Sequence, residues 1–128
     1  MNPTLFLIVP RRIIDIFAIY IWNMDNTKQA EEIIKTTARK YIPDAEVVLF
    51  GSRARMTHDS ESDYDILIIT HKNLTPKQKM PYKTKIRKEL LQSNIRSDIL
   101  VQSHKEIEMK KKLPGHIIKT ILNDSIHL

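Results

Sequence analysis

The sequence predicts a mixed α/β (α+β) domain in which a small mixed central sheet is backed by helices. Three short segments, 45–50, 63–70 and 95–102, are apolar and rich in branched residues, as buried strands are. Longer segments before and after them repeat apolar residues at helical spacing. The resulting order is helix, strand, strand, helix, strand, helices, and a chain of 128 residues is long enough for one modest core.

The first expected helix covers residues from about Asn26 to Tyr41. Asn26 or Thr27 can cap it, and Pro43 ends it. One face carries apolar and small residues at helical spacing, so we expect that face to be buried. Its members are Ala30, Ile33, Ile34, Thr37, Ala38, Tyr41 and Ile42.

The strand expected at 63–70 contains an uninterrupted Ile-Leu-Ile-Ile run, which indicates layers on both of its faces. Pro76 beyond it suits the first position of a helix. Pro81 argues against a helix that continues from there, because an interior proline costs about 3 kcal/mol. We therefore expect the helix at Tyr82–Gln92. Its inward residues would be Tyr82, Ile86, Leu90 and Leu91.

Two short helices are expected after the third strand. Ser103 can cap a charged helix at 104–112, and Pro114-Gly115 separates that helix from a last one at 116–123. No internal repeat or low-complexity linker occurs between these elements. The elements therefore form a single domain, which we place at residues 24–128.

Residues 1–23 are interpreted as an apolar extension that is dispensable for chemistry. A proline, two arginines and an aspartate divide this segment into runs shorter than the roughly 20 residues of a membrane helix. Its positive charge follows the first apolar run, whereas a signal peptide has positive charge before it. The segment could be a docking helix, an added strand pair or an extension ahead of a true start at Met24. No membrane association is expected.

Composition narrows the class of partner. The chain has 21 Lys and Arg against 15 Asp and Glu, a net charge of +6, which favours nucleotides, nucleic acid or an acidic protein surface. The lysine-rich stretch 72–88 is interpreted as a solvated helix face, because it lacks the aromatic residues that stack on single strands. Nucleic acid is therefore not the expected partner.

Cysteine is absent, which excludes disulfides and thiolate metal sites, and a cytoplasmic location is the default.

The turn between the first two strands is typical of a phosphate-binding turn. Gly51 follows a strand directly, and without a Cβ it lets a ligand approach the backbone. Ser52 offers a hydroxyl and a backbone N–H at the start of an expected short helix, where the helix dipole favours an anion. Arg53 and Arg55 add positive charge, and one or both are able to reach a triphosphate or to brace an aspartate. These four residues are the candidate nucleotide-binding residues.

Ten residues separate Ser52 from Asp63, which opens the second strand together with Asp65. Side chains two apart in a strand point to the same face, so the two carboxylates lie side by side. They would repel unless a cation lay between them, and all-oxygen ligands suit Mg²⁺ or Mn²⁺. Asp98, near the start of the third strand, is the candidate third carboxylate. Asp63, Asp65 and Asp98 are therefore the candidate catalytic and metal-binding residues.

The Gly51-Ser52 pair, the ten-residue spacing and Asp63-Tyr64-Asp65 resemble the signature of the DNA polymerase β-like nucleotidyltransferase superfamily. More narrowly, they resemble its small prokaryotic members, the minimal nucleotidyltransferases (MNT). The resemblance covers about residues 26–128. It implies a polymerase β-like palm fold, in which a small sheet carries three carboxylates, and nucleotidyl transfer from a nucleoside triphosphate. Met56 departs from the pattern, since the family often has glycine there. Either the turn differs, or it is re-formed when substrate binds.

The resemblance also implies a partner and a reaction. Many minimal nucleotidyltransferases are similar to antitoxins that inactivate a HEPN-domain toxin by adding AMP to a tyrosine. It therefore implies a nucleotidyltransferase that moves AMP from ATP to a hydroxyl on such a partner. The alternative is a non-catalytic MNT-type antitoxin that neutralises its partner by binding. Little chain follows Gln102 to hold an acceptor, so we expect the acceptor to arrive on another protein or a homodimer to supply the missing wall.

Overall fold

The computed structural model describes residues 11–54 and 62–128. It contains two compact units, Met1–Glu32 and Ile33–Leu128. Across the described ranges, every helix is too short or too polar to cross a bilayer. The domain boundary expected at Met24 stays a prediction.

Helix α2, Arg11–Tyr41, is longer than the sequence indicated. The expected cap at Asn26 or Thr27 is wrong, because both residues lie inside this helix. No proline or glycine occurs along its length, so nothing in the sequence stops it there. Within the second unit, its last turns bury Ile34 and Ala38, which confirms the expected inward face.

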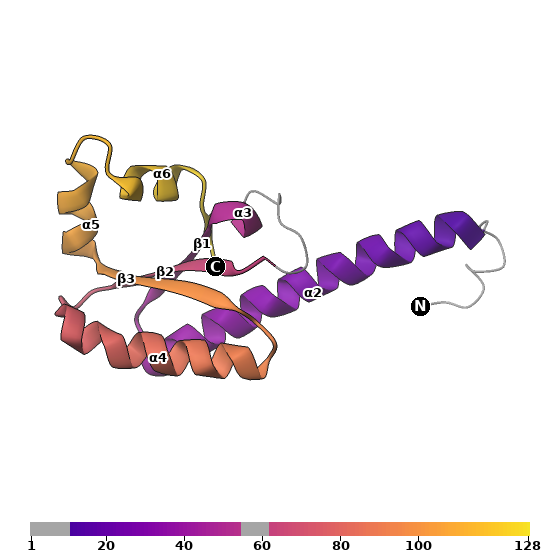
Figure 1. Ribbon diagram of the computed structural model, residues 1–128, viewed down its shortest axis with the longest axis horizontal. Coiled ribbons are helices and arrows are strands. Elements are labelled where there is room, and N and C mark those ends of the chain that lie inside the picture. Colours follow the sequence, from indigo (N-terminus) through magenta and orange to yellow (C-terminus); the bar gives the residue numbers. More distant parts are fainter. Residues whose placement is uncertain (1–10, 55–61) are drawn as a thin grey trace. The chain divides into compact units, whose positions relative to one another are not determined.

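A four-stranded sheet of order β3-β2-β1-β4 forms the centre of the second unit (Figure 1). Strand β1 pairs antiparallel with both β2 and β4, whereas β2 pairs parallel with β3. The predicted mixed sheet is therefore confirmed. The strands are β1 Glu46–Phe50, β2 Tyr64–Thr70, β3 Ser97–Ser103 and β4 Ile126–His127.

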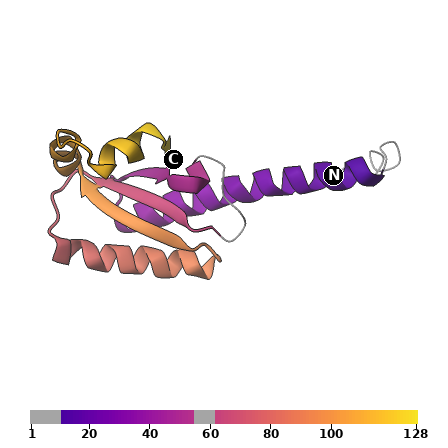
Figure 2. The same ribbon diagram turned by 45° about the horizontal axis from the view of Figure 1, so that its top comes forward.

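Helices cover both faces of this sheet. Helix α4, Pro76–Gln92, lies on one face, and helices α5, His104–Lys111, and α6, Ile117–Asn123, lie on the other (Figures 1 and 2). Every residue of β2 from Ile66 to Thr70 is buried, as expected for a strand between two layers. The cluster on the α5 and α6 side comprises Val48, Leu67, Ile69, Ile107, Ile118 and Ile121.

Two expectations for α4 are wrong. The helix runs continuously from Pro76 through Pro81, and Leu91 is exposed rather than inward. Pro81 lies early in the helix, and both Pro81 and Lys77, whose carbonyl loses its helical partner there, are exposed residues. A full capping box, Thr75 with Gln78, stabilises the start of the helix.

Candidate active site

The parallel pairing of β2 with β3 sets two of the three predicted carboxylates side by side. Asp65 and Asp98 are direct partners in the register of the two strands. Neighbouring residues at the same register project to the same face of a sheet. Asp65 alternates with Leu67 and Ile69, so this is the face that carries α5 and α6. The two acids lie at the start of their strands, Asp65 half-buried and Asp98 exposed.

Gly51 brings the turn against this pair. It begins helix α3, Gly51–Ala54, directly after β1, as the sequence predicted. Its φ of +74° lies in the left-handed region that favours glycine. A Cβ at this position would collide with Oδ2 of Asp65. The backbone of the turn therefore lies directly against the Asp65 carboxylate, and Ser52 follows it in α3.

Arg53 is engaged with the chain segment that leads into β2. Its Nε and Nη2 both donate to the carbonyl oxygen of Ser62, at 3.2 Å and 2.8 Å. Its guanidinium also lies over the ring of Tyr64, 4.2 Å from the ring centroid. These contacts fasten α3 to the residues on either side of Asp63. The sequence allowed Arg53 either to reach a triphosphate or to brace an aspartate, and it did not predict these contacts with the Ser62 backbone and the Tyr64 ring.

Asp63 lies just before β2 and faces a basic residue. Its Oδ1 is 3.6 Å from Nε of Arg96, and both side chains are more than half exposed. Arg96 also accepts a hydrogen bond at its carbonyl oxygen from the Tyr64 N–H, at 2.9 Å, which joins the starts of β2 and β3. Sequence reasoning overlooked Arg96, because its contact with Asp63 depends on how the starts of β2 and β3 meet in space.

A divalent cation fits the chemistry of the site that the Gly51 turn and the starts of β2 and β3 form. Carboxylate oxygens on adjacent strands are the ligands that Mg²⁺ and Mn²⁺ prefer, and such ions take their remaining ligands from water and substrate phosphates. In the part of the chain that the structure describes, no group of three or more His, Cys, Asp or Glu side chains is arranged to hold a metal. The structure pairs Asp65 with Asp98, while Asp63 is turned to Arg96. Arg55 and Met56 lie outside the described residues.

Comparison with known proteins assigns the chain to a family. Residues 30–127 match the sequence profile of the nucleotidyltransferase domain family. Among solved structures, the chain is similar to a candidate nucleotidyltransferase from Sulfolobus solfataricus, with 26% identity over 79% of this chain and 77% of that one. The TM-score is 0.42, so nothing about the site is transferred from that likeness. No curated protein matches the chain. The chain belongs to the nucleotidyltransferase domain family.

Proposed function

We propose that this protein transfers a nucleoside monophosphate, AMP from ATP, to an acceptor hydroxyl on a partner protein. The observation that supports it most is the register of Asp65 with Asp98 beside the Gly51 turn. Paired carboxylates next to a close-approach turn suit a substrate that brings a triphosphate and its cation together. The proposal includes a cytoplasmic location, because ATP is abundant there.

In this proposal Asp65 and Asp98 would hold the Mg²⁺ or Mn²⁺ ion, with Asp63 as a third ligand. When bound, such an ion would neutralise charge on the phosphates and lower the pKa of a nearby hydroxyl. Asp63 can join because an exposed ion pair such as its contact with Arg96 is worth about 1 kcal/mol or less.

The chain's own groups then have distinct tasks. Asp98, exposed at the start of β3, accepts the proton from the acceptor hydroxyl. The acceptor oxygen forms a bond to the α-phosphorus as the bond from that phosphorus to pyrophosphate breaks. Gly51 and Ser52 hold the leaving phosphates through backbone N–H groups and the Ser52 hydroxyl.

Resemblance to the minimal nucleotidyltransferases supports the identity of the acceptor. It implies a HEPN-type toxin, modified on a tyrosine hydroxyl. The test incubates the protein and such a partner with Mg²⁺ and ATP labelled at either the α- or the γ-phosphate. We expect label on the partner from the α-position only, because pyrophosphate takes the γ-phosphate away. The other nucleoside triphosphates are compared in parallel.

Two results would reject the enzyme. Label from the γ-phosphate would indicate a phosphotransfer reaction. Tight partner binding without label from any nucleotide would indicate an antitoxin that neutralises by masking.

Arg53 provides a separate prediction about this reaction. Because both of its bonded nitrogens reach Ser62, we expect it to position Asp63 and Asp65 rather than to bind phosphate through charge. Arg53→Lys and Arg53→Met should then lower kcat alike, by roughly ten- to hundredfold, since small misplacements of catalytic groups cost that much. KM for ATP should change little. A raised KM that lysine restores would instead assign Arg53 to the phosphates.

A further inference from the structure

Two histidines meet at the end of the sheet opposite the candidate active site, and the proposed reaction uses neither of them. Their rings lie 4.8 Å apart, centroid to centroid, with the ring planes tilted by 40°. His71 directly follows β2 and His104 directly follows β3, and the last residues of these strands are register partners. The parallel pairing that sets Asp65 beside Asp98 at one end of the strands therefore sets the two imidazoles together at the other end.

Glu46 brings a carboxylate to the same place. It begins β1, where it is the register partner of Ile69, two residues before His71. Oε1 of Glu46 lies 3.8 Å from Nε2 of His104. The two imidazoles and this carboxylate come from three neighbouring parts of the chain that the sheet brings together. We call His71, His104 and Glu46 the His–His–Glu cluster.

One nitrogen of the cluster is left without a bond. Nε2 of His104 is shielded from solvent and has no hydrogen-bond partner in the part of the chain that the structure describes. The Glu46 carboxylate, at 3.8 Å, is beyond hydrogen-bond distance. Buried polar atoms ordinarily have a partner, and a bound ion is one kind of partner. The side chains of His104 and Glu46 are 45% and 48% exposed overall, so an ion can reach this nitrogen from solvent.

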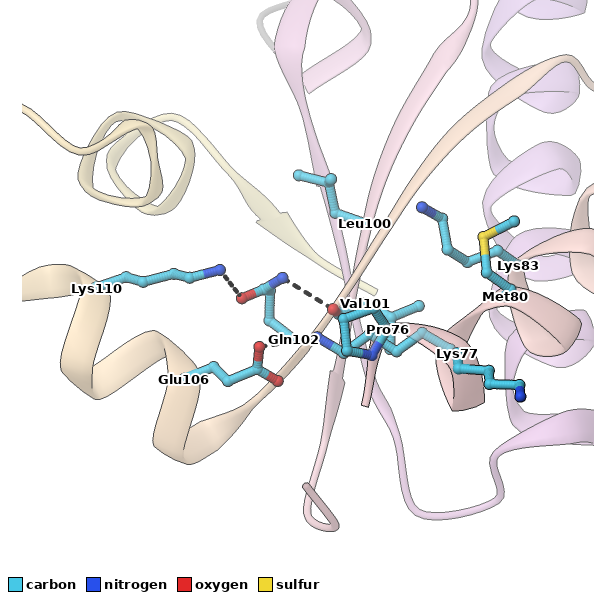
Figure 3. A pocket seen from close by; sticks show the side chains of 10 residues that line it. Pro76, Lys77, Met80, Lys83, Leu100, Val101, Gln102, Glu106 and Lys110 are labelled. Carbon is cyan, nitrogen blue, oxygen red and sulfur yellow. Dashed lines mark hydrogen bonds and ion pairs between the residues drawn. The ribbon is translucent and has the colours of Figure 1, made fainter. Parts of the chain in front are cut away.

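The start of α5 holds His104 in place. Ser103 and Glu106 form a full capping box, in which each backbone N–H donates to the side chain of the other residue at 3.1 Å. Oε2 of Glu106 lies 2.8 Å from Nζ of Lys79. Glu106 thus reaches into the groove between α4 and α5 (Figure 3). Its carboxylate is committed to these contacts, and Glu46 is the carboxylate that faces His104.

The separations within the cluster suit ligands of one zinc ion. With Zn–N bonds of about 2 Å in a tetrahedral site, two imidazole centroids lie roughly 5 Å apart and two ligand atoms roughly 3.4 Å apart. The corresponding distances in the cluster are 4.8 Å and 3.8 Å. As placed, no three such side chains among the described residues surround a single point. Rotation of the side chains of His71 and Glu46, both exposed residues, would complete the site.

We propose that His71, His104 and Glu46 bind a zinc ion, with water as the fourth ligand. Two imidazoles with one carboxylate suit Zn²⁺, whereas Mg²⁺ prefers oxygen ligands alone. The site is separate from the carboxylates proposed for catalysis, because His71 lies six residues beyond Asp65, a rise of about 20 Å along a strand. The ion therefore stabilises the fold, since it ties the start of β1 to the start of α5, and takes no part in transfer.

Zinc binding by the untagged full chain tests this site without nucleotide, so its outcome is independent of the transfer assay. The chain is titrated with Zn²⁺ in a calorimeter, with excess Mg²⁺ present to occupy sites made of oxygen ligands. We expect one zinc ion per chain. His71→Asn and His104→Asn should each weaken binding by about a hundredfold, because loss of even an outer-shell partner costs ten- to hundredfold. His116→Asn is the matched control, since it removes an imidazole from the N-cap of α6 but leaves a side chain that can cap it.

Thermal unfolding gives a second readout. Zinc should raise the unfolding temperature of the wild-type chain, because an ion that binds only the folded state stabilises that state. Asp65→Asn should respond as the wild type does, and the two cluster variants should not respond. The same scans without zinc show whether each variant folds. NMR of the wild type with Co²⁺ keeps the test independent of the variants, since a bound cobalt ion should shift the ring resonances of His71 and His104 strongly.

Three results would each overturn the proposal. The first is no zinc binding in excess Mg²⁺. The second is equal zinc affinity in the three histidine variants. The third is a cobalt ion that leaves the His71 and His104 rings unshifted.

Discussion

Asp65→Asn is expected to abolish nucleotidyl transfer and to leave the fold intact. The amide has the shape of the carboxylate but lacks the charge that holds a divalent cation. A bound ion would stabilise the transition state at the phosphates by several kcal/mol. Its loss is therefore expected to lower kcat by about three orders of magnitude. Stability should stay within about 1 kcal/mol of the wild-type value, because the change is isosteric and relieves repulsion with Asp98. Transfer of label and urea unfolding measure the two effects.

Two variants complete this prediction. Asp98→Asn should lose activity to a similar extent, since Asp98 is the register partner of Asp65. Asp124→Asn is the matched control, an identical chemical change at the exposed C-cap of α6. Transfer by the Asp65→Asn protein at more than a small fraction of the wild-type rate would remove Asp65 from the site.

Gly51→Ala is expected to impair both folding and activity. A φ of +74° costs a residue with a Cβ about 1–2 kcal/mol. The new methyl group would also collide with the Asp65 carboxylate, so that carboxylate must move away from Asp98. We expect activity to fall by about a hundredfold, as for other small displacements of catalytic groups.

Gly115→Ala separates the two causes. Gly115 has a φ of +70°, nearly that of Gly51, but nothing lies within 4 Å of the Cβ it would gain. It should therefore lose about as much conformational stability and keep full activity. Denaturant unfolding and the transfer assay, run on both variants, make the comparison. Similar activity in the two variants would show that the contact of Gly51 with Asp65 has no part in the reaction.

The strands and the glycine turn were predictable because their signals are local. A short branched apolar run has few alternatives to a buried strand, and a glycine between a strand and a helix marks a close approach. The length of α2 was not predictable from caps alone. Asn26 and Thr27 favour a helix start but do not stop a helix that already runs through them. Strand β4 has only two residues, too few to form a pattern.

The composition of the site was predictable in part. Register follows from pairing across the whole of β2 and β3, and the Asp65–Asp98 pair requires both that the two strands be parallel neighbours and that they adopt this register. The contacts of Arg53 with Ser62 and of Arg96 with Asp63 depend on how separate segments meet in space. No spacing in the sequence encodes such contacts. The continuity of α4 through Pro81 likewise depends on which side of the helix faces solvent.

The most direct measurement is a crystal structure of the protein with Mn²⁺ and an ATP analogue whose α-phosphate cannot be transferred. Anomalous scattering from manganese locates the ion independently of any assumption about its ligands. We expect a peak between the carboxylates of Asp65 and Asp98, with the triphosphate against Gly51 and Ser52. A manganese peak bound elsewhere, with neither Asp65 nor Asp98 touching it, would contradict the site.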